Sequence, residues 1–245
     1  MRDIALSVII PARNDAEALS RTLGDLERLE MRERVEVIVA AAGERPGTER
    51  AVGGRARLLW PDGSTRARLM NAGAAVAGAP ALLFLHADSL PPRDVVALIG
   101  AALEGPDVVG GAFEFRFAEP VRTLRLLTAM NRIRYRTTRN YYGDQGLFVR
   151  AEVFHHLGGF RDLALMEDLD WSRRLRRAGR TVLITTPIVS SGRRFLARGP
   201  WRTTAFCAWL LLLYTLRLDT DRYAEHWRGP ADRAPGSPWP RPSRR

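Results

Sequence analysis

Residues 81–88 read Ala-Leu-Leu-Phe-Leu-His-Ala-Asp, an unbroken apolar run that ends in a histidine and an aspartate. A run without polar alternation is typical of a strand covered on both faces, as in the parallel sheet of an α/β protein. Ligands of such sheets bind beyond the carboxyl ends of the strands. If the strand continues that far, His86 and Asp88 point to the same side. Asp88 could then hold Mg²⁺ or Mn²⁺ against a diphosphate, or it could equally cap the turn at 89–92.

Strand and helix patterns alternate through the first half of the chain, which predicts a doubly wound α/β sheet flanked by helices. The expected strands are 6–10, 35–39, 57–60, 81–85, 146–150 and 181–184. The expected helices are 15–29, 65–77, 94–103, 121–137, 151–157 and 167–178, and a loop is expected at 43–47. The alternating stretch 110–117 predicts a half-exposed strand that begins a smaller, mixed part of the sheet.

The composition restricts the partners and the compartment. All 38 basic residues of the 245-residue chain are arginines, and the net charge of +11 favours anionic partners, although a GC-rich genome produces the same bias. No basic stripe interleaved with aromatic residues occurs, so nucleic-acid binding is not expected. Cys207 is the only cysteine, which excludes an intrachain disulfide and favours a reducing compartment, the cytoplasm.

Domain boundaries are expected at two places near the C-terminus. Residues 1–200 are expected to form the main domain, followed by an apolar helical segment at 201–228 and a disordered, Pro/Arg-rich tail at 229–245. The apolar stretch 201–218 contains Arg202 and Arg217, so its uninterrupted apolar part is too short to cross a bilayer. It predicts either a helix docked on the core or a helix that lies in the membrane interface, peripheral to the inner face of the cell membrane.

Five short segments occur in a specific order. They are Ser-Val-Ile-Ile-Pro-Ala-Arg-Asn at 7–14, Arg-Ala-Arg-Leu-Met-Asn-Ala-Gly at 66–73, Leu-Phe-Leu-His-Ala-Asp at 83–88, Gly-Asp-Gln at 143–145 and Leu-Met-Glu-Asp at 165–168. Together they resemble the family 2 glycosyltransferases with the GT-A fold. The likeness is to the bacterial subgroup called rSAM/selenodomain-associated or arsenosugar-biosynthesis glycosyltransferases, and it extends from Leu6 to about Trp227.

The resemblance implies a metal-dependent, inverting transfer of a sugar from a nucleotide-diphosphate donor to a small-molecule or lipid-like acceptor. The matching residue for the general base is Asp168, and Glu167 would orient it or contact the acceptor. The alternative is that both carboxylates only complement the dipole of their helix, with Asp170 pairing with Arg173 or Arg174.

The metal site implied by the resemblance is reduced in this chain. Asp88 matches the metal-binding carboxylate of the family's Asp-x-Asp motif, whereas His86 replaces the first aspartate. The site would therefore hold Mg²⁺ or Mn²⁺ with one protein carboxylate, phosphate oxygens and water. His86 is a secondary ligand candidate or a structural residue.

The remaining motifs are expected to contact the donor and the acceptor. Pro11, Ala12, Arg13 and Asn14 would form the floor of the nucleotide site. Arg66 and Asn71 would hold phosphate or ribose near a helix start, unless they belong to a solvated helix face. Asp144 and Gln145 would face the sugar or the acceptor, unless they form a simple turn before a strand.

One departure from the family pattern affects the donor site. Ala41 occupies the position where relatives carry an aspartate that contacts the nucleotide base or ribose, and Asp62 or Glu44 are the candidates to compensate. Two other functions are therefore weighed. A sugar nucleotidyltransferase would need a glycine-rich, basic loop after the first strand, which residues 11–14 lack. A non-catalytic nucleotide-sugar-binding or membrane-surface scaffold would explain Ala41 but not the retention of Asp88 and Asp168.

Overall fold

The computed structural model describes residues 4–228, so the tail expected at 229–245 lies outside the described residues. The strands are β1 (Leu6–Arg13), β2 (Val35–Ala42), β3 (Arg57–Leu59), β4 (Ala81–Phe84), β5 (Ser89–Leu90), β6 (Val108–Phe117), β7 (Leu147–Arg150) and β8 (Arg180–Ser190). The helices are α1 (Ala16–Leu26), α2 (Arg45–Val52), α3 (Arg66–Ala75), α4 (Val95–Ala102), α5 (Arg122–Thr138), α6 (Ala151–His156), α7 (Glu167–Ala178), α8 (Arg193–Arg198), α9 (Pro200–Thr215) and α10 (Ala224–Arg228).

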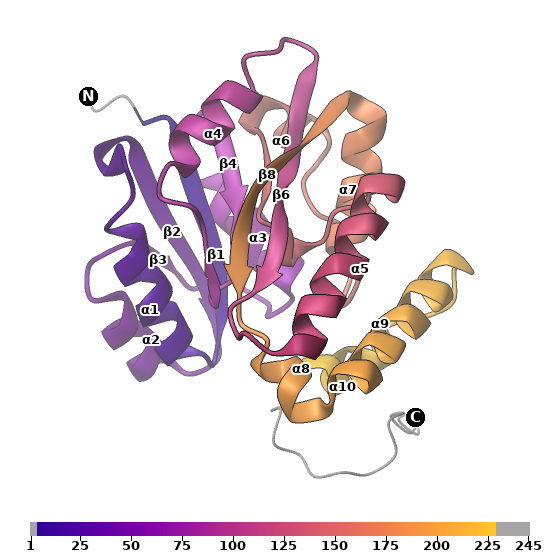
Figure 1. Cartoon of the computed structure of the whole chain (residues 1–245). Helices are drawn as coiled ribbons and strands as arrows, with labels where there is room; N and C mark the ends of the chain where they lie inside the picture. The colour runs from indigo at the N-terminus through magenta and orange to yellow at the C-terminus, as the bar shows by residue number, and fades with distance from the viewer. Residues whose placement is uncertain (1–3, 229–245) are drawn as a thin grey trace.

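The strands form one mixed sheet in the order β3-β2-β1-β4-β7-β6-β8-β5 (Figure 1). Strands β3, β2, β1 and β4 are parallel neighbours, whereas β7 is antiparallel to both β4 and β6. The reversal at β7 means that the end of β4 and the start of β7 lie at the same edge of the sheet. The α/β class and the mixed sheet flanked by helices, both expected from the sequence, are confirmed.

Two apolar clusters cover the two faces of the sheet. Leu6, Val8 and Ile10 of β1 pack in the cluster that includes α1, α2 and α4, whereas Ile9 packs in the cluster that includes α3, α6 and α7. This division follows from the strand geometry, because successive side chains point to opposite faces. Ile9 is fully buried, so truncation to alanine is expected to cost about 2–5 kcal/mol.

Helix α2 forms where a loop is expected. The side chain of Glu44 accepts a hydrogen bond from the backbone N of Gly47 at 3.2 Å and caps this helix. Pro46 lies in the first turn, where its missing N–H costs no hydrogen bond. The Pro-Gly pair that suggests a loop is thus part of a helix start.

Strands β6 and β8 are more extensively paired and more buried than their sequences indicate. β8 runs to Ser190 because it pairs with β6 in parallel over most of its length, and a register shift next to Glu114 accommodates Pro187. The alternation in β6 predicts a half-exposed strand, but Glu114 is only 2% exposed. Arg132 and Arg136 of α5 pair with this carboxylate and cover it.

Candidate active site

The edge of the sheet at the carboxyl end of β4 gathers most of the expected site residues. Phe84, the last residue of β4, pairs with Leu147, the first residue of β7. The segment after β4 carries His86 and Asp88, and the 3₁₀ turn Gly143–Gln145 leads into β7, so the two segments meet at this edge. Strand β4 ends at Phe84, one residue before the expected end, and the chain turns after His86, so the condition that the strand reaches Asp88 is not met. His86 and Asp88 consequently have different partners.

Arg66, the first residue of α3, contacts three of the expected site residues. Its guanidinium donates through Nε to Glu167, through Nη2 to Asp168 Oδ2 at 3.2 Å and through Nη1 to His86 Nε2 at 2.7 Å. Burial alone would lower the pKa of Arg66, but Glu167 and Asp168 raise it above its ordinary value. The structure therefore shows Arg66 holding the carboxylate pair rather than projecting freely to bind phosphate or ribose.

Asp168 is tightly placed in the first turn of α7. Its Oδ2 accepts a hydrogen bond from the backbone N of Gly143 at 2.8 Å, and its Oδ1 accepts one from Leu169 N at 2.7 Å. Gly143 has no room for a side chain, because a Cβ there would lie 2.6 Å from His86 Nε2. The side chain of Asp168 is 12% exposed, so the carboxylate can still be reached from solvent.

Glu167 is almost fully enclosed, with 3% of its side chain exposed. Burial raises its pKa, and the neighbouring charge of Arg66 opposes this rise. Asp170 forms an ion pair with Arg174 at 2.7 Å, which is one of the two pairings expected if the acidic residues only complement the helix dipole. Glu167 and Asp168 instead face Arg66, so they do more than complement the helix dipole.

Asp144 and Gln145 have different surroundings although they are adjacent. Gln145 is buried, accepts a hydrogen bond from Tyr142 N at 3.1 Å and donates one to Phe113 O at 3.1 Å. These contacts fit the alternative in which Gln145 belongs to a turn before a strand. Asp144 is half-buried in the same turn, near Asp168 and Arg66. Burial raises the pKa of Asp144 to about 6. Asp144 is therefore a carboxyl group that titrates near neutral pH beside Asp168.

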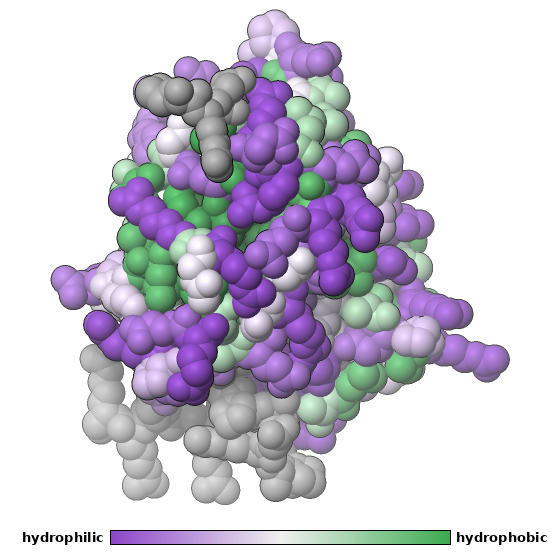
Figure 2. Space-filling model, turned by 90° about the vertical axis from the view of Figure 1, so that its left-hand side faces the viewer, coloured by the Kyte–Doolittle hydropathy of each residue, from purple (hydrophilic) through white to green (hydrophobic). Residues whose placement is uncertain are grey.

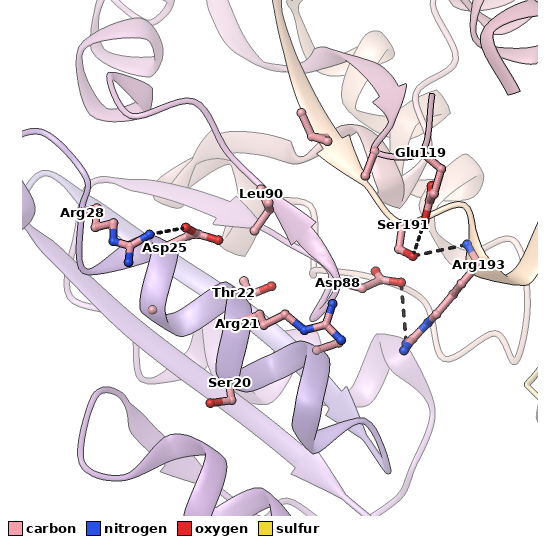
Figure 3. Close-up of a pocket in the computed structure, with 14 residues that line it drawn as sticks. Ser20, Arg21, Thr22, Asp25, Arg28, Asp88, Leu90, Glu119, Ser191 and Arg193 are labelled. Atoms are coloured by element: carbon pink, nitrogen blue, oxygen red, sulfur yellow. Dashed lines mark hydrogen bonds and ion pairs between the residues drawn. The ribbon is translucent and has the colours of Figure 1, made fainter. Parts of the chain in front are cut away.

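Asp88 lines a hollow of about 410 Å³ between α1, β5 and the end of β8 (Figure 3). Asp168 is not among the residues that line it. The carboxylate of Asp88 lies 4.0 Å from Arg193 Nη2, and the same nitrogen pairs with Asp15. Burial raises the pKa of Asp88, Arg193 opposes the rise and Asp15 adds to it.

The residues around Asp88 could supply only a few of the ligands of a hard cation such as Mg²⁺. Within residues 4–228 there is no group of three His, Cys, Asp or Glu side chains that could hold a metal ion. Asp88 and Asp15 both reach Arg193, so their two carboxylates approach one cationic position. Mg²⁺ is commonly held by one or two carboxylates together with substrate phosphates and water. The donor set therefore suits a metal that arrives with a diphosphate.

The contacts of His86 fit the structural one of its two expected roles. Burial, with the charges of Arg66 and Arg194, lowers the pKa of His86 well below its usual value, so the ring is neutral. Because a guanidinium only donates, His86 Nε2 accepts from Arg66 and the ring proton lies on Nδ1. Neither ring nitrogen has a lone pair left for a metal ion.

The expected nucleotide floor lies at the end of β1 and just beyond it. Pro11 and Ala12 belong to β1 itself, and Arg13 is exposed at its last position. Asn14 adopts a left-handed conformation with φ of 52°, and its Oδ1 accepts a hydrogen bond from Glu44 N at 2.8 Å. Residues 13–14 thus present polar groups beyond the carboxyl end of β1, where ligands of such sheets bind.

Asn71 is not part of this floor. Its Nδ2 donates to Phe160 O at 2.8 Å and its Oδ1 accepts from Phe160 N at 2.9 Å. Both ends of the amide therefore fasten the loop before α7, and the expected contact with phosphate or ribose is replaced by this structural one.

Ala41 lies inside β2 and is 1% exposed. It packs in the cluster beneath α1 and α2, so the loss of the family's aspartate at this position is filled by apolar packing. Of the two residues that could compensate, Glu44 caps α2 and Asp62 is exposed.

Two arginines that the sequence analysis passed over approach the site. Arg193 and Arg194 begin α8, directly after the end of β8. The charge of Arg194 acts on His86, Asp88 and Arg66. Burial lowers the pKa of Arg194, and no carboxylate lies within ion-pair distance of it among the described residues. An Arg-Arg pair directly beyond the last strand is the signal that could have identified them.

This chain resembles a known protein family and several solved structures. The family model described as Glycosyl transferase family 2 matches residues 7–159. A search of curated proteins finds no match. Among solved structures, the chain is similar to the mannosyltransferase PcManGT from Pyrobaculum calidifontis in complex with GDP-Man and Mn²⁺, with a TM-score of 0.61 and 20% identity. That match covers 81% of this chain and 64% of the mannosyltransferase.

The chain is also similar to residues 1–349 of TarS from S. aureus, with a TM-score of 0.62 and 13% identity, covering 79% of this chain and 62% of that one. A complex of the same TarS fragment with UDP-GlcNAc matches with a TM-score of 0.61 and 13% identity, covering 77% and 58% of the two chains. The chain thus spans less than two thirds of the length of these structures. At such identities the likeness shows the fold, which is GT-A.

Proposed function

This chain belongs to glycosyltransferase family 2, and we propose that it transfers a sugar from a nucleotide-diphosphate donor to a small-molecule or lipid-like acceptor, with inversion at the anomeric carbon. The observation that carries the proposal is that the segments of Asp168, Asp144 and Asp88 meet at one edge of the sheet: Asp168 accepts from Gly143 N, and Ser190 Oγ contacts both Asp144 O at 3.4 Å and Ser89 Oγ, next to Asp88, at 2.5 Å. Neighbours in the same fold are complexes with GDP-Man and with UDP-GlcNAc, which supports a nucleotide-sugar as the donor.

In the proposed reaction the acceptor hydroxyl oxygen forms a bond to the anomeric carbon while the bond from that carbon to the diphosphate oxygen breaks. The nucleoside diphosphate leaves with the electron pair, and the hydroxyl proton passes to the carboxylate of Asp168. Arg66 and Gly143 N hold this carboxylate in a fixed orientation, and Glu167 holds Arg66. A positioned general base contributes typically 10²–10⁴-fold to a rate.

Negative charge on the leaving diphosphate would be balanced by the cationic groups near Asp88. Arg193 and Arg194 are suited to phosphate because guanidinium groups bind it in a bidentate manner. Asp88, with Asp15, would hold Mg²⁺ or Mn²⁺, which supplies charge neutralisation of the diphosphate when it is bound. The complex of PcManGT with Mn²⁺ supports a metal of this kind.

The donor would lie over residues 11–14, with Asp144 near the sugar or the acceptor. Ala41 is buried and has no carboxylate, so the contact that the family's aspartate makes with the nucleotide base or ribose is missing. The identity of the base and of the sugar is therefore left open. Assignment to the rSAM/selenodomain-associated subgroup stays a prediction. A peripheral contact of α9 with a membrane is part of this proposal, and nucleic acid is not among the proposed partners.

A screen of nucleotide-sugars with Mn²⁺ by thermal unfolding tests the proposal. A ligand that binds only the folded state at 100 times its Kd stabilises it by about 2.7 kcal/mol. We expect one donor class to raise the melting temperature and to be consumed when an acceptor is present. Binding without any turnover would favour the second candidate, a non-catalytic scaffold, which the loss of the aspartate at Ala41 supports.

A further inference from the structure

Helix α9 has two unlike faces. Phe206 and Leu210 are buried against Leu165 and Ala224, so this face of the helix is docked on the protein. The opposite face exposes large apolar side chains, and they continue past its end: Trp201 (53%), Trp209 (37%), Leu212 (48%), Leu216 (59%) and Leu218 (51%). We call these five residues the α9 outer face. No helix among the described residues is long and apolar enough to cross a membrane.

The α9 outer face is long and narrow. Sixteen residues of α-helix extend about 24 Å, and a helix is about 10 Å wide. Such a strip offers a few hundred Å², whereas a stable contact with a second copy needs about 800 Å² from each partner. A contiguous exposed apolar strip of this kind marks an interaction site.

The charge around α9 is strongly positive. Residues 193–222 contain six arginines and two acidic residues. Arg202 in the first turn and Arg217 just beyond the last turn are both exposed and flank the α9 outer face. Two copies that met through this strip would bring like charges together. An apolar helix face with tryptophans and flanking arginines is complementary to a bilayer that contains anionic lipids. By contrast, the face on the α1 and α2 side is mostly hydrophilic (Figure 2).

Another edge of α9 lies beside the candidate active site. Cys207 lies on this edge, where burial raises the pKa of its thiol to about 12 and the nearby charge of Asp144 adds to the rise. Asp168 acts on the same thiol. Contacts place α9 beside the start of α7: Tyr214 OH donates to Asp170 Oδ1 at 3.4 Å, and Met166, the residue before Glu167, packs against the cluster that contains Phe206 and Leu210. The helix that carries the apolar strip therefore adjoins the segment that carries Glu167 and Asp168.

We propose that the α9 outer face docks on an anionic lipid bilayer and that the acceptor is a lipid-linked hydroxyl compound delivered from that bilayer past α9 to Asp144 and Asp168. The docking stands on α9 alone, whereas the acceptor class rests on the proposed glycosyltransferase function. Docking in this orientation brings the hydroxyl of a membrane-borne acceptor to the base.

Co-sedimentation with vesicles of phosphatidylcholine, with and without phosphatidylglycerol, tests the docking. The test variant is Leu212→Glu/Leu216→Glu, which alters two exposed side chains. The control is Met31→Glu, because Met31 is 38% exposed in the turn after α1. We expect the parent chain and the control to sediment with the anionic vesicles, and the double variant to bind about tenfold more weakly or less. High salt should weaken the binding of the parent chain.

The melting temperature and the donor-induced shift of the double variant should match those of the parent chain, which separates docking from folding and from donor binding. With labelled donor, the sugar should enter the lipid fraction when extracted lipids serve as acceptors.

Failure of the parent chain to bind anionic vesicles, or equal binding by the double variant, overturns the docking. A dimer that the double variant abolishes would assign the strip to a second copy instead. Label transferred only to water-soluble acceptors overturns the acceptor class, and no donor binding at all overturns the proposed function while leaving the docking intact.

Discussion

The Nη2 atom of Arg66, at the start of α3, lies 3.2 Å from the Oδ2 atom of Asp168, in the first turn of α7. The same guanidinium pairs with Glu167 and contacts His86, so one side chain fixes the position of His86 relative to the adjacent pair Glu167 and Asp168, which lies far away in the sequence. Because Arg66 stays protonated at any accessible pH, the carboxylate of Asp168 is held in place without depending on the state of a weaker base.

Loss of Arg66 should destabilise the fold chiefly through Glu167. Arg66→Met leaves a carboxylate that is 3% exposed without its partner, and breaking such a pair costs about 3 kcal/mol. The double variant Arg66→Met/Glu167→Gln should recover more than half of the loss, as urea unfolding can show. The neighbouring variant Arg68→Met is the control, since its ion pair with Asp162 is exposed and contributes about 1 kcal/mol or less. Equal losses in the single and double variants would show that Glu167 does not depend on Arg66.

Asp144 should make the stability depend on pH in a defined direction. Its pKa of about 6 exceeds the ordinary value of an aspartate, so the native state binds this proton more tightly than the unfolded state does. Its contribution is therefore present at pH 4 and is lost as the pH rises toward about 6. Asp144→Asn should gain stability relative to the parent chain above pH 6, by about 2 kcal/mol at most after allowance for partial exposure. Unfolding free energies of both proteins between pH 4 and 8 test this, and a constant difference would contradict it.

Arg194 should contribute to donor affinity. The guanidinium of Arg194 lies 5.0 Å from the ring centroid of Trp227 and has no carboxylate partner among residues 4–228, so its N–H groups can donate to a diphosphate; a hydrogen bond to a charged group contributes about 1.5–3 kcal/mol. Arg194→Ala should therefore raise the donor Kd by about tenfold or more in calorimetry. Arg28→Ala removes the same charge from an exposed pair with Asp25 and should leave the Kd unchanged. Equal effects of the two substitutions would indicate a general charge effect instead.

Asp88 should determine the response to Mn²⁺. Asp88→Asn should abolish the increment in melting temperature that Mn²⁺ adds to the donor, because the replacement removes the carboxylate charge. Asp25→Asn is the matched control, since Asp25 lines the same hollow. If Asp88→Asn retained the full Mn²⁺ increment, the metal would have to be held elsewhere.

The parts of the fold that the sequence predicts well are those with a strong local pattern. The buried run of β4 and the acidic start of α7 lie where they are expected, because apolar continuity and helix periodicity are local properties. Helix α2 and most of β8 were not expected. Pro46 and Gly47 disguise a helix start, and the threonines of β8 become strand residues only through their pairing with β6.

Side-chain roles were less predictable than positions. The sequence indicates that Arg66, Asn71, His86 and Gln145 belong near the site, but their partners come from segments that only the fold brings together. Asn71 binds a backbone 89 positions away, and His86 accepts from Arg66, so neither is free for a ligand. Arg194 was missed for the same reason, since its neighbour Asp88 lies far away in the sequence.

The most direct test of the central claim compares sugar transfer by the parent chain and by Asp168→Asn, with a labelled nucleotide-sugar that has been shown to bind. Asparagine keeps the shape of the side chain and can still accept from Gly143 N, but it cannot take a proton. We expect an unchanged donor Kd and a transfer rate at least about 10²-fold lower. Transfer by Asp168→Asn at the rate of the parent chain would contradict the assignment of Asp168 as the base.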